Sequence, residues 1–221
     1  MRPAPIVLAF DTSAAHCAAA LLSGGAIVAA RREEMGRGQA ERLMPLLGEM
    51  LDAAGIGWRD LDGIGVGVGP GNFTGIRIAV SAARGLALGL DVSAVGVTGF
   101  EALALGLEGP VLAILPAPRD TLYVQTVIDG QAQGTPQQLA PAELPHAFDL
   151  PPGTRLVGPG AEALAATLGL PVAPPLAAGI GPAIARIAAT RLGQSLPRPA
   201  PLYLRPADAA PPSDPPPVIL P

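Results

Sequence analysis

The sequence contains no lysine, because all 14 of its basic Lys and Arg positions are arginine. A P-loop needs a lysine that reaches the phosphates, and Schiff-base catalysis needs a lysine amine, so both are excluded. The 221 residues include one cysteine, Cys17, which excludes an internal disulfide. One cysteine and two histidines also give no metal-ligand pattern. Aromatic residues make up 3% of the chain, so we expect a core of Ala, Val, Leu and Ile.

Charge and hydropathy give little sign of a nucleic-acid or membrane partner. The formal net charge is −4, and no stretch is strongly basic, so a broad phosphate-backbone footprint is not expected. The uncharged stretch 163–185 contains four prolines, which argue against a membrane-spanning helix. The apolar run before Asp11 is too short for a signal peptide. We therefore expect a cytoplasmic protein without membrane contact.

The first half of the chain alternates apolar runs with turn residues in the order β-β-β-α-β-α-β-α. The helix expected at 39–55 is amphipathic, and Gly55 is suited to cap its C-terminus. Thr98 and Glu101 have the spacing of a capping box at the start of another helix. The expected strands are 6–10, 16–22, 26–31, 63–69 and 92–97, and the expected helices are 39–55, one from the loop at 69–77 to about 88, and 98–107.

The second half of the chain repeats the start of this pattern, which indicates a weak internal duplication. The run 111–131 matches 7–26 as strand, turn, strand and hairpin turn. In this repeat the place of Asp11 falls at Leu115 or Pro116, so the carboxylate is missing. A further glycine loop that opens a helix is expected at 158–169, followed by another helix at 182–193 and a last short strand at 201–205. Seven of the 16 residues from 206 to 221 are proline, which predicts a disordered tail.

Two segments near the predicted strand ends offer polar groups for a ligand. Asp11 ends a strand, where a carboxylate can hold Mg²⁺ through water or orient a water; the alternative is a plain Asx or ST turn. The loop at 69–77, GPGNFTGIR, offers helix N–H groups that attract an anion, unless Asn72 and Thr74 cap them in a structural turn. The possible nucleotide- or anion-binding residues are Asp11, Thr12, Gly69, Gly71, Asn72, Thr74 and Arg77.

The helix at 39–55 and the helix after the glycine loop carry more apolar surface than one sheet face needs. The second helix is also rich in small residues, which let another backbone approach closely. A surplus apolar patch marks a protein interface, and the alternative is ordinary core packing. The expected partner-interface residues are Leu43, Leu47, Met50, Leu51, Ile76, Val80 and Ala83.

The chain resembles the bacterial TsaB family, also called YeaZ, in five motifs: LAFDTS (8–13), ERLMP (41–45), GVGVGPGNFTGIRIAVSAARGLALG (65–89), VGVTGFEALA (95–104) and PLYLR (201–205). The resemblance implies an α/β fold of two ribonuclease-H-like domains of the actin-like ATPase superfamily, with mixed sheets flanked by helices. The expected domains are 1–105, with the interface helices, and 106–205, a degenerate second copy, before the proline-rich tail at 206–221.

The resemblance also implies a role in forming N6-threonylcarbamoyladenosine in tRNAs that read ANN codons. The chain would be a non-catalytic subunit that binds the transferase TsaD as a heterodimer, with the ATPase TsaE joining the complex, and it would also self-associate as a homodimer. It would meet tRNA only through the complex. It would need no cofactor or metal of its own, with ATP or ADP and Mg²⁺ acting at the level of the complex. The histidine pair that holds the metal in TsaD-like proteins is absent, since His16 and His146 lie far apart in the sequence.

Two positions depart from the pattern of the family. Gln39 stands where relatives often have a histidine, and Pro116, Ala117 and Pro118 stand where many have Asp-Ala-Arg. A different function, an actin-like ATPase or small-molecule kinase acting alone, is indicated by Asp11 and the glycine loops, but the missing second carboxylate opposes it. A nucleic-acid-binding module is opposed by the acidic charge and the scarcity of aromatic residues.

Overall fold

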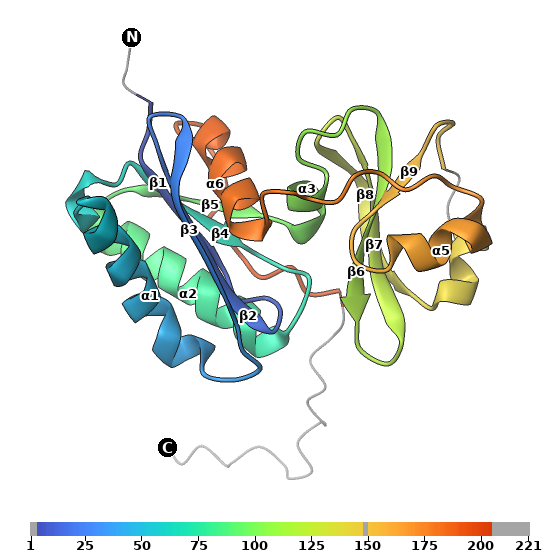
Figure 1. Cartoon of the computed structure of the whole chain (residues 1–221), viewed down its shortest axis with the longest axis horizontal. Coiled ribbons are helices and arrows are strands. Elements are labelled where there is room, and N and C mark those ends of the chain that lie inside the picture. The colour runs from blue at the N-terminus through green and yellow to red at the C-terminus, as the bar shows by residue number, and fades with distance from the viewer. Residues whose placement is uncertain (1–3, 148–149, 205–221) are drawn as a thin grey trace, which may run out of the picture.

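Two mixed β-sheets organise the chain in a computed structural model that describes residues 4–147 and 150–204 (Figure 1). The predicted tail at 206–221 lies outside the described residues. The first half contains β1 (Val7–Asp11), β2 (His16–Ser23), β3 (Ala26–Glu34), α1 (Gln39–Ala54), β4 (Gly63–Gly67), α2 (Phe73–Leu90), β5 (Ser93–Val97) and α3 (Gly99–Leu103). The second half contains β6 (Pro110–Ala117), β7 (Thr121–Ile128), β8 (Gln131–Leu139), α4 (Leu144–Ala147), β9 (Arg155–Val157), α5 (Ala161–Leu168) and α6 (Ile180–Arg191).

The two sheets share one topology, which agrees with the predicted duplication. The first has the strand order β3-β2-β1-β4-β5, with β1 antiparallel to β2 and parallel to β4. The second has the order β8-β7-β6-β9, with β6 antiparallel to β7 and parallel to β9. A single parallel bridge between Leu156 and Val172 continues the second sheet beyond β9. These are the two ribonuclease-H-like domains of an actin-like fold.

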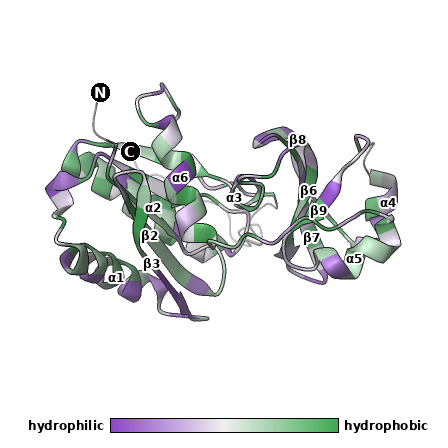
Figure 2. Cartoon of the chain, turned by 45° about the horizontal axis from the view of Figure 1, so that its top comes forward, coloured by the Kyte–Doolittle hydropathy of each residue, from purple (hydrophilic) through white to green (hydrophobic). Residues whose placement is uncertain are grey.

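The first sheet is covered by helices on both faces, and β1 shows how its sequence permits this. Leu8 and Phe10 pack on the side of α1 and α2, whereas Val7 and Ala9 pack on the side of α6. Since successive strand residues point to opposite faces, a strand buried on both sides must be apolar throughout. Figure 1 shows α1 and α2 next to each other on one side of the sheet, with α6 on the other. In Figure 2, hydrophilic and hydrophobic residues alternate along α1, as expected for an amphipathic helix.

The position of helix α6 differs from the predicted division into domains. Its sequence position lies within 106–205, but Ala183, Ile184 and Ala188 pack against the first sheet rather than the second. Gly181 shows how closely the helix approaches β2, because a Cβ there would lie 3.0 Å from the carbonyl carbon of Ala19. The first domain therefore includes a segment from near the end of the chain.

The second sheet is covered by shorter helices. Phe100 and Ala104, from α3 and its end, pack on the face that carries Val111 and Ala113. Helices α4 and α5 cover the opposite face, where Leu164 packs in the cluster with Leu112 and Ile114. Helix α3 thus lies between the two sheets, because it also contacts α6 on the first domain.

Two predicted elements differ from the structure. The helix predicted through 107 ends at Leu103, although its predicted capping box is present: Thr98 Oγ1 accepts from the Glu101 N–H at 3.2 Å. The strand predicted at 201–205 is wrong for 201–204, where Leu202 N–H donates one backbone hydrogen bond to Val68 O at 2.8 Å. Prolines at 197, 199 and 201 remove backbone donors from this segment, so no ladder forms.

Helix α2 is, by length and composition alone, apolar enough to cross a membrane; it is the one such helix among the described residues. It packs on the first sheet through its buried residues Gly75, Ile76, Ala79, Val80 and Ala83. A helix that packs on a protein core passes the same test of length and composition, so α2 is weak support for membrane insertion.

Candidate functional site

The turn after β1 and the glycine loop before α2 are packed directly on each other. The Asn72 N–H donates to Ser13 O at 2.7 Å, and Thr12 Oγ1 donates to Gly75 O at 2.6 Å. A Cβ on Gly71 would collide with Ser13 O, and one on Gly75 would collide with Thr12 O. Both glycines are therefore required here by close approach of two backbones.

The same loop caps helix α2. The Asn72 side chain accepts a hydrogen bond from the Gly75 N–H at 2.9 Å, so Asn72 is the N-cap. Thr74 was predicted to share this role, but it lies inside the helix, in its exposed first turn. One of the N–H groups that would attract an anion is thus already used within the protein.

Asp11 is the centre of a buried polar cluster at the end of β1. Its Oδ1 accepts from the Ser13 N–H at 3.1 Å and from Ser13 Oγ at 2.9 Å, and His16 Nε2 lies 2.8 Å away. Asp11 is 2% exposed and His16 is 5% exposed. The predicted turn at 11–13 is therefore present, and it also holds a histidine.

The contact of His16 with Asp11 was not predicted from the sequence. In the β1–β2 hairpin Asp11 pairs with Ala18, and His16 lies two residues from Ala18. Residues two apart on a strand share a face, so His16 is placed on the same side as the carboxylate. The alternation of side chains along β1 and β2 decides which residues share a face with Asp11. This alternation depends on the register between the two strands, which the sequence did not reveal.

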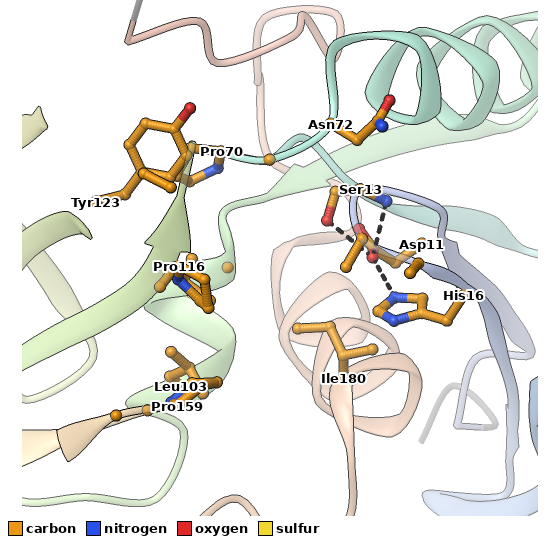
Figure 3. A pocket seen from close by; sticks show the side chains of 18 of the residues that line it. Asp11, Ser13, His16, Pro70, Asn72, Leu103, Pro116, Tyr123, Pro159 and Ile180 are labelled. Atoms are coloured by element: carbon orange, nitrogen blue, oxygen red, sulfur yellow. Dashed lines mark hydrogen bonds and ion pairs between the residues drawn. The ribbon is translucent and has the colours of Figure 1, made fainter. Parts of the chain in front are cut away.

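This cluster borders a cleft of about 1400 Å³ between the two domains. Figure 3 shows Asp11, His16, Asn72 and Ile180 on one side and Leu103, Pro116 and Pro159 on the other. The first wall comes from β1, β2, α6 and the glycine loop, and the second from α3, β6 and the loop before α5. The cleft thus lies where the two sheets face each other.

Of the seven residues predicted to bind a nucleotide or anion, Asp11, Gly71 and Asn72 line this cleft. Thr12 is fully buried and donates to Gly75. The cleft lining does not include Gly69, Thr74 or Arg77. Anion binding by this set stays a prediction.

Arg77 has a structural partner on the C-terminal segment. Its guanidinium lies 3.8 Å from the centre of the Phe73 ring, and its Nε donates to the Tyr203 hydroxyl at 2.8 Å. The Phe73 and Tyr203 rings are 4.9 Å apart. This stack attaches residues 201–204 to the start of α2.

The predicted partner-interface residues are wrong as surface positions. They are at most 3% exposed and belong to the core between α1, α2 and the first sheet, where they are covered by the chain itself. The seven residues concerned are Leu43, Leu47, Met50, Leu51, Ile76, Val80 and Ala83. The alternative of ordinary core packing is therefore the correct one for them.

Cys17 is fully buried and packs in the core as a small apolar residue. Burial, and secondly the nearby Glu33, raises the pKa of its thiol, which disfavours the thiolate. Within residues 4–147 and 150–204, no group of three or more His, Cys, Asp or Glu side chains is arranged to hold a metal ion.

Comparison with known proteins identifies the family. Residues 30–144, more than half of the chain, match the family described as "TsaD: tRNA N6-adenosine threonylcarbamoyltransferase". The Escherichia coli K12 protein named "tRNA threonylcarbamoyladenosine biosynthesis protein TsaB" is 36% identical over 100 residues, which cover 45% of this chain and 43% of that protein. The structure of YeaZ from Pseudomonas aeruginosa aligns over 90% of this chain and 100% of that one, with a TM-score of 0.68 and 26% identity.

The chain belongs to the TsaB (YeaZ) family. It spans about half the length of the first curated TsaB relatives that it matches. An uncharacterized protein of Mycobacterium tuberculosis is 36% identical over 178 residues, which cover 79% of each chain.

The two positions that depart from the TsaB pattern both line the cleft. Gln39 begins α1, where its Nε2 donates to Met35 O at 3.1 Å. Pro116 and Pro118 lie at the end of β6 and just after it, in the turn that corresponds to the one holding Asp11. Proline has no N–H, so the second domain offers fewer backbone donors to the cleft than the first.

We predict that Gly75→Ala lowers the free energy of unfolding by about 1–3 kcal/mol, because the added methyl group must displace the backbone at Thr12. Gly85→Ala is the matched control on the same helix, since no atom lies within 4 Å of its Cβ position. It is expected to leave stability unchanged or raise it by up to about 1 kcal/mol. Urea unfolding monitored by circular dichroism measures both, and equal effects would contradict the close packing.

We predict that Asn72→Ala destabilises the protein by about 1 kcal/mol, because Gly75 N–H loses its acceptor at the start of α2. Asn72→Asp retains the acceptor and a favourable charge at the helix N-terminus, so its stability should match or exceed that of the unaltered protein. Thermal unfolding compares the three proteins. A similar loss in both variants would show that the capping bond is unimportant.

Proposed function

We propose that this chain is a non-catalytic subunit that binds and activates TsaD in the formation of N6-threonylcarbamoyladenosine in ANN-decoding tRNAs. The observation that carries the proposal is the composition of α2, together with membership of the TsaB family. This helix is strongly apolar, yet only five of its 18 residues are buried within the chain. Its Leu88 side chain and the exposed glycines beside it are left uncovered by the chain and are available to a partner.

The exposed face of α2 has the shape expected of a helix-packing surface. Leu88 is 84% exposed, and Ser81, Gly85 and Gly89 are small and exposed on the same helix. The Cβ positions of Gly85 and Gly89 open into free space. A second helix could therefore approach this backbone closely, with Leu88 inserted against it.

Helix α1 extends this surface. It contacts α2 and packs on the same face of the first sheet, and its Met44 is 42% exposed. Arg42 forms ion pairs with Glu33 at 2.7 Å and with Glu49 at 2.6 Å. These pairs hold a charged cluster on α1. The proposed TsaD interface thus consists of the outward faces of α1 and α2, and the same surface would serve for homodimer formation when TsaD is absent.

A non-catalytic role fits the way the polar groups are used. The Asp11 carboxylate is held by Ser13 and His16, and Thr12 is bonded to the helix backbone. These groups hold the fold together at the place where an actin-like enzyme would work. In this proposal the chain acts in the cytoplasm, TsaE joins at the level of the complex, and ATP, Mg²⁺ and tRNA are bound there.

We predict that Leu88→Asp reduces the affinity for TsaD at least about tenfold, because it places a charge in the apolar contact. Co-purification and titration with TsaD measure the effect. Val172→Asp is the control: Val172 is an exposed apolar side chain of the second domain, where the same substitution should leave TsaD binding unchanged. Undiminished binding of Leu88→Asp would contradict the proposed interface.

The alternative, an ATPase or kinase acting alone, is tested on the isolated chain. Under the scaffold proposal, calorimetric titration with Mg-ATP gives no tight binding and no turnover. Tight binding with turnover that is abolished by Asp11→Asn would favour the alternative, because Asp11 is the carboxylate that lines the cleft from β1.

A further inference from the structure

We propose that the cleft between the two domains binds a small organic amine with an apolar body. The first reason is the polar wall formed by β1 and β2. Among the described residues, His16 Nδ1 is the buried side-chain nitrogen or oxygen atom that has no hydrogen-bond partner. His16 is more than nine-tenths buried and lines the cleft, and Figure 3 shows its ring turned toward Ile180 and the opposite wall.

The hydrogen bonds of Asp11 determine what His16 offers to a ligand. Ser13 donates twice to Asp11 Oδ1, and we assign the proton on His16 Nε2 to the third contact with the same oxygen. The neutral imidazole then presents the lone pair of Nδ1. An acceptor at this position selects a ligand that donates a hydrogen bond, because an unpaired buried acceptor costs free energy.

The charges around the cleft favour a cation. The charged side chains that line it are Asp11, Arg32 and Glu162. Arg32 forms an ion pair with Glu34 at 2.6 Å, and Glu34 is not part of the cleft lining, so the charge of Arg32 is compensated by a group outside the cleft. Asp11 and Glu162 remain as negative groups on facing walls. A phosphate or carboxylate is therefore disfavoured, and an ammonium group is favoured.

The remaining lining favours an apolar body. Its large apolar side chains include Leu103 from α3, Leu115 from β6, Leu176 from the segment before α6, and Ile180 from the start of α6. Pro116 lies on the same wall and has no N–H to offer an anion. A concave apolar lining with a few convergent polar groups is the usual form of a small-molecule site. This wall thus complements an amine whose ammonium group lies toward Asp11 and His16.

Three probes with the same phenolic ring test the charge preference: tyramine has an ammonium group, tyrosol a hydroxyl and 4-hydroxyphenylacetate a carboxylate. Calorimetric titration of the full chain, without any partner protein, should give the order tyramine, tyrosol, 4-hydroxyphenylacetate. We expect at least about a tenfold difference in Kd between the first and the last. Equal affinities, a preference for the carboxylate or no binding of tyramine at millimolar concentration would overturn the proposal.

Two variants locate the binding in the cleft. Glu162→Gln alters an exposed residue and should weaken tyramine binding severalfold without loss of stability. His16→Gln keeps an N–H donor for Asp11 but replaces the ring and its Nδ1 by an amide whose oxygen occupies a different position, so it should also weaken binding. Glu108→Gln is the matched control, because Glu108 is exposed and outside the cleft lining, so the affinity should not change. Equal effects of Glu162→Gln and Glu108→Gln would overturn the assignment of the site.

The chain itself contains a competing cation, since Arg205 follows the cleft-lining residue Leu204. Titration of a variant that ends at residue 204 distinguishes this occupant. Similar tyramine affinity with and without residues 205–221 supports a small-molecule site. Binding that appears only after their removal assigns the cleft to the chain's own C-terminal segment and overturns the proposal.

Discussion

The contact between the turn at 11–13 and the loop at 69–75 positions both the start of α2 and one edge of the cleft. Two hydrogen bonds, Asn72 N–H to Ser13 O and Thr12 Oγ1 to Gly75 O, join segments that are some sixty residues apart in the chain. The two glycines let the backbones meet without side chains between them. The contact fixes where α2 begins, and it places Asp11 at the edge of the cleft.

The same contact links the two surfaces to which we assign roles. Helix α2 begins at this loop and extends away from it with its exposed outer face, and the cleft opens on the side of Asp11 and His16. Arg77 attaches the C-terminal segment to the first turns of the same helix. A docked protein that displaced α2 would therefore also displace the cleft wall, because the position of the helix and that of the wall depend on the same backbone contacts.

The sequence was a good guide to the strands of the first sheet and to the internal repeat, because apolar runs and turn residues are local signals. It was a poor guide to what covers each apolar residue. Leu47 and Val80 were assigned to a partner although the first sheet covers them, since a helical apolar stripe looks the same in a core and in an interface. The contacts of α6 and His16 depend on long-range packing and strand register, which periodicity does not encode.

The return of α6 to the first sheet has a consequence for synthesis of the chain. Val7 and Ala9 emerge early from the ribosome, but the helix that covers them is translated only about 170 residues later. Until then one face of the first sheet has no cover, and exposed apolar strands favour aggregation. The first domain is therefore complete only after the second has been synthesised, and premature termination within the second domain would leave the first without α6.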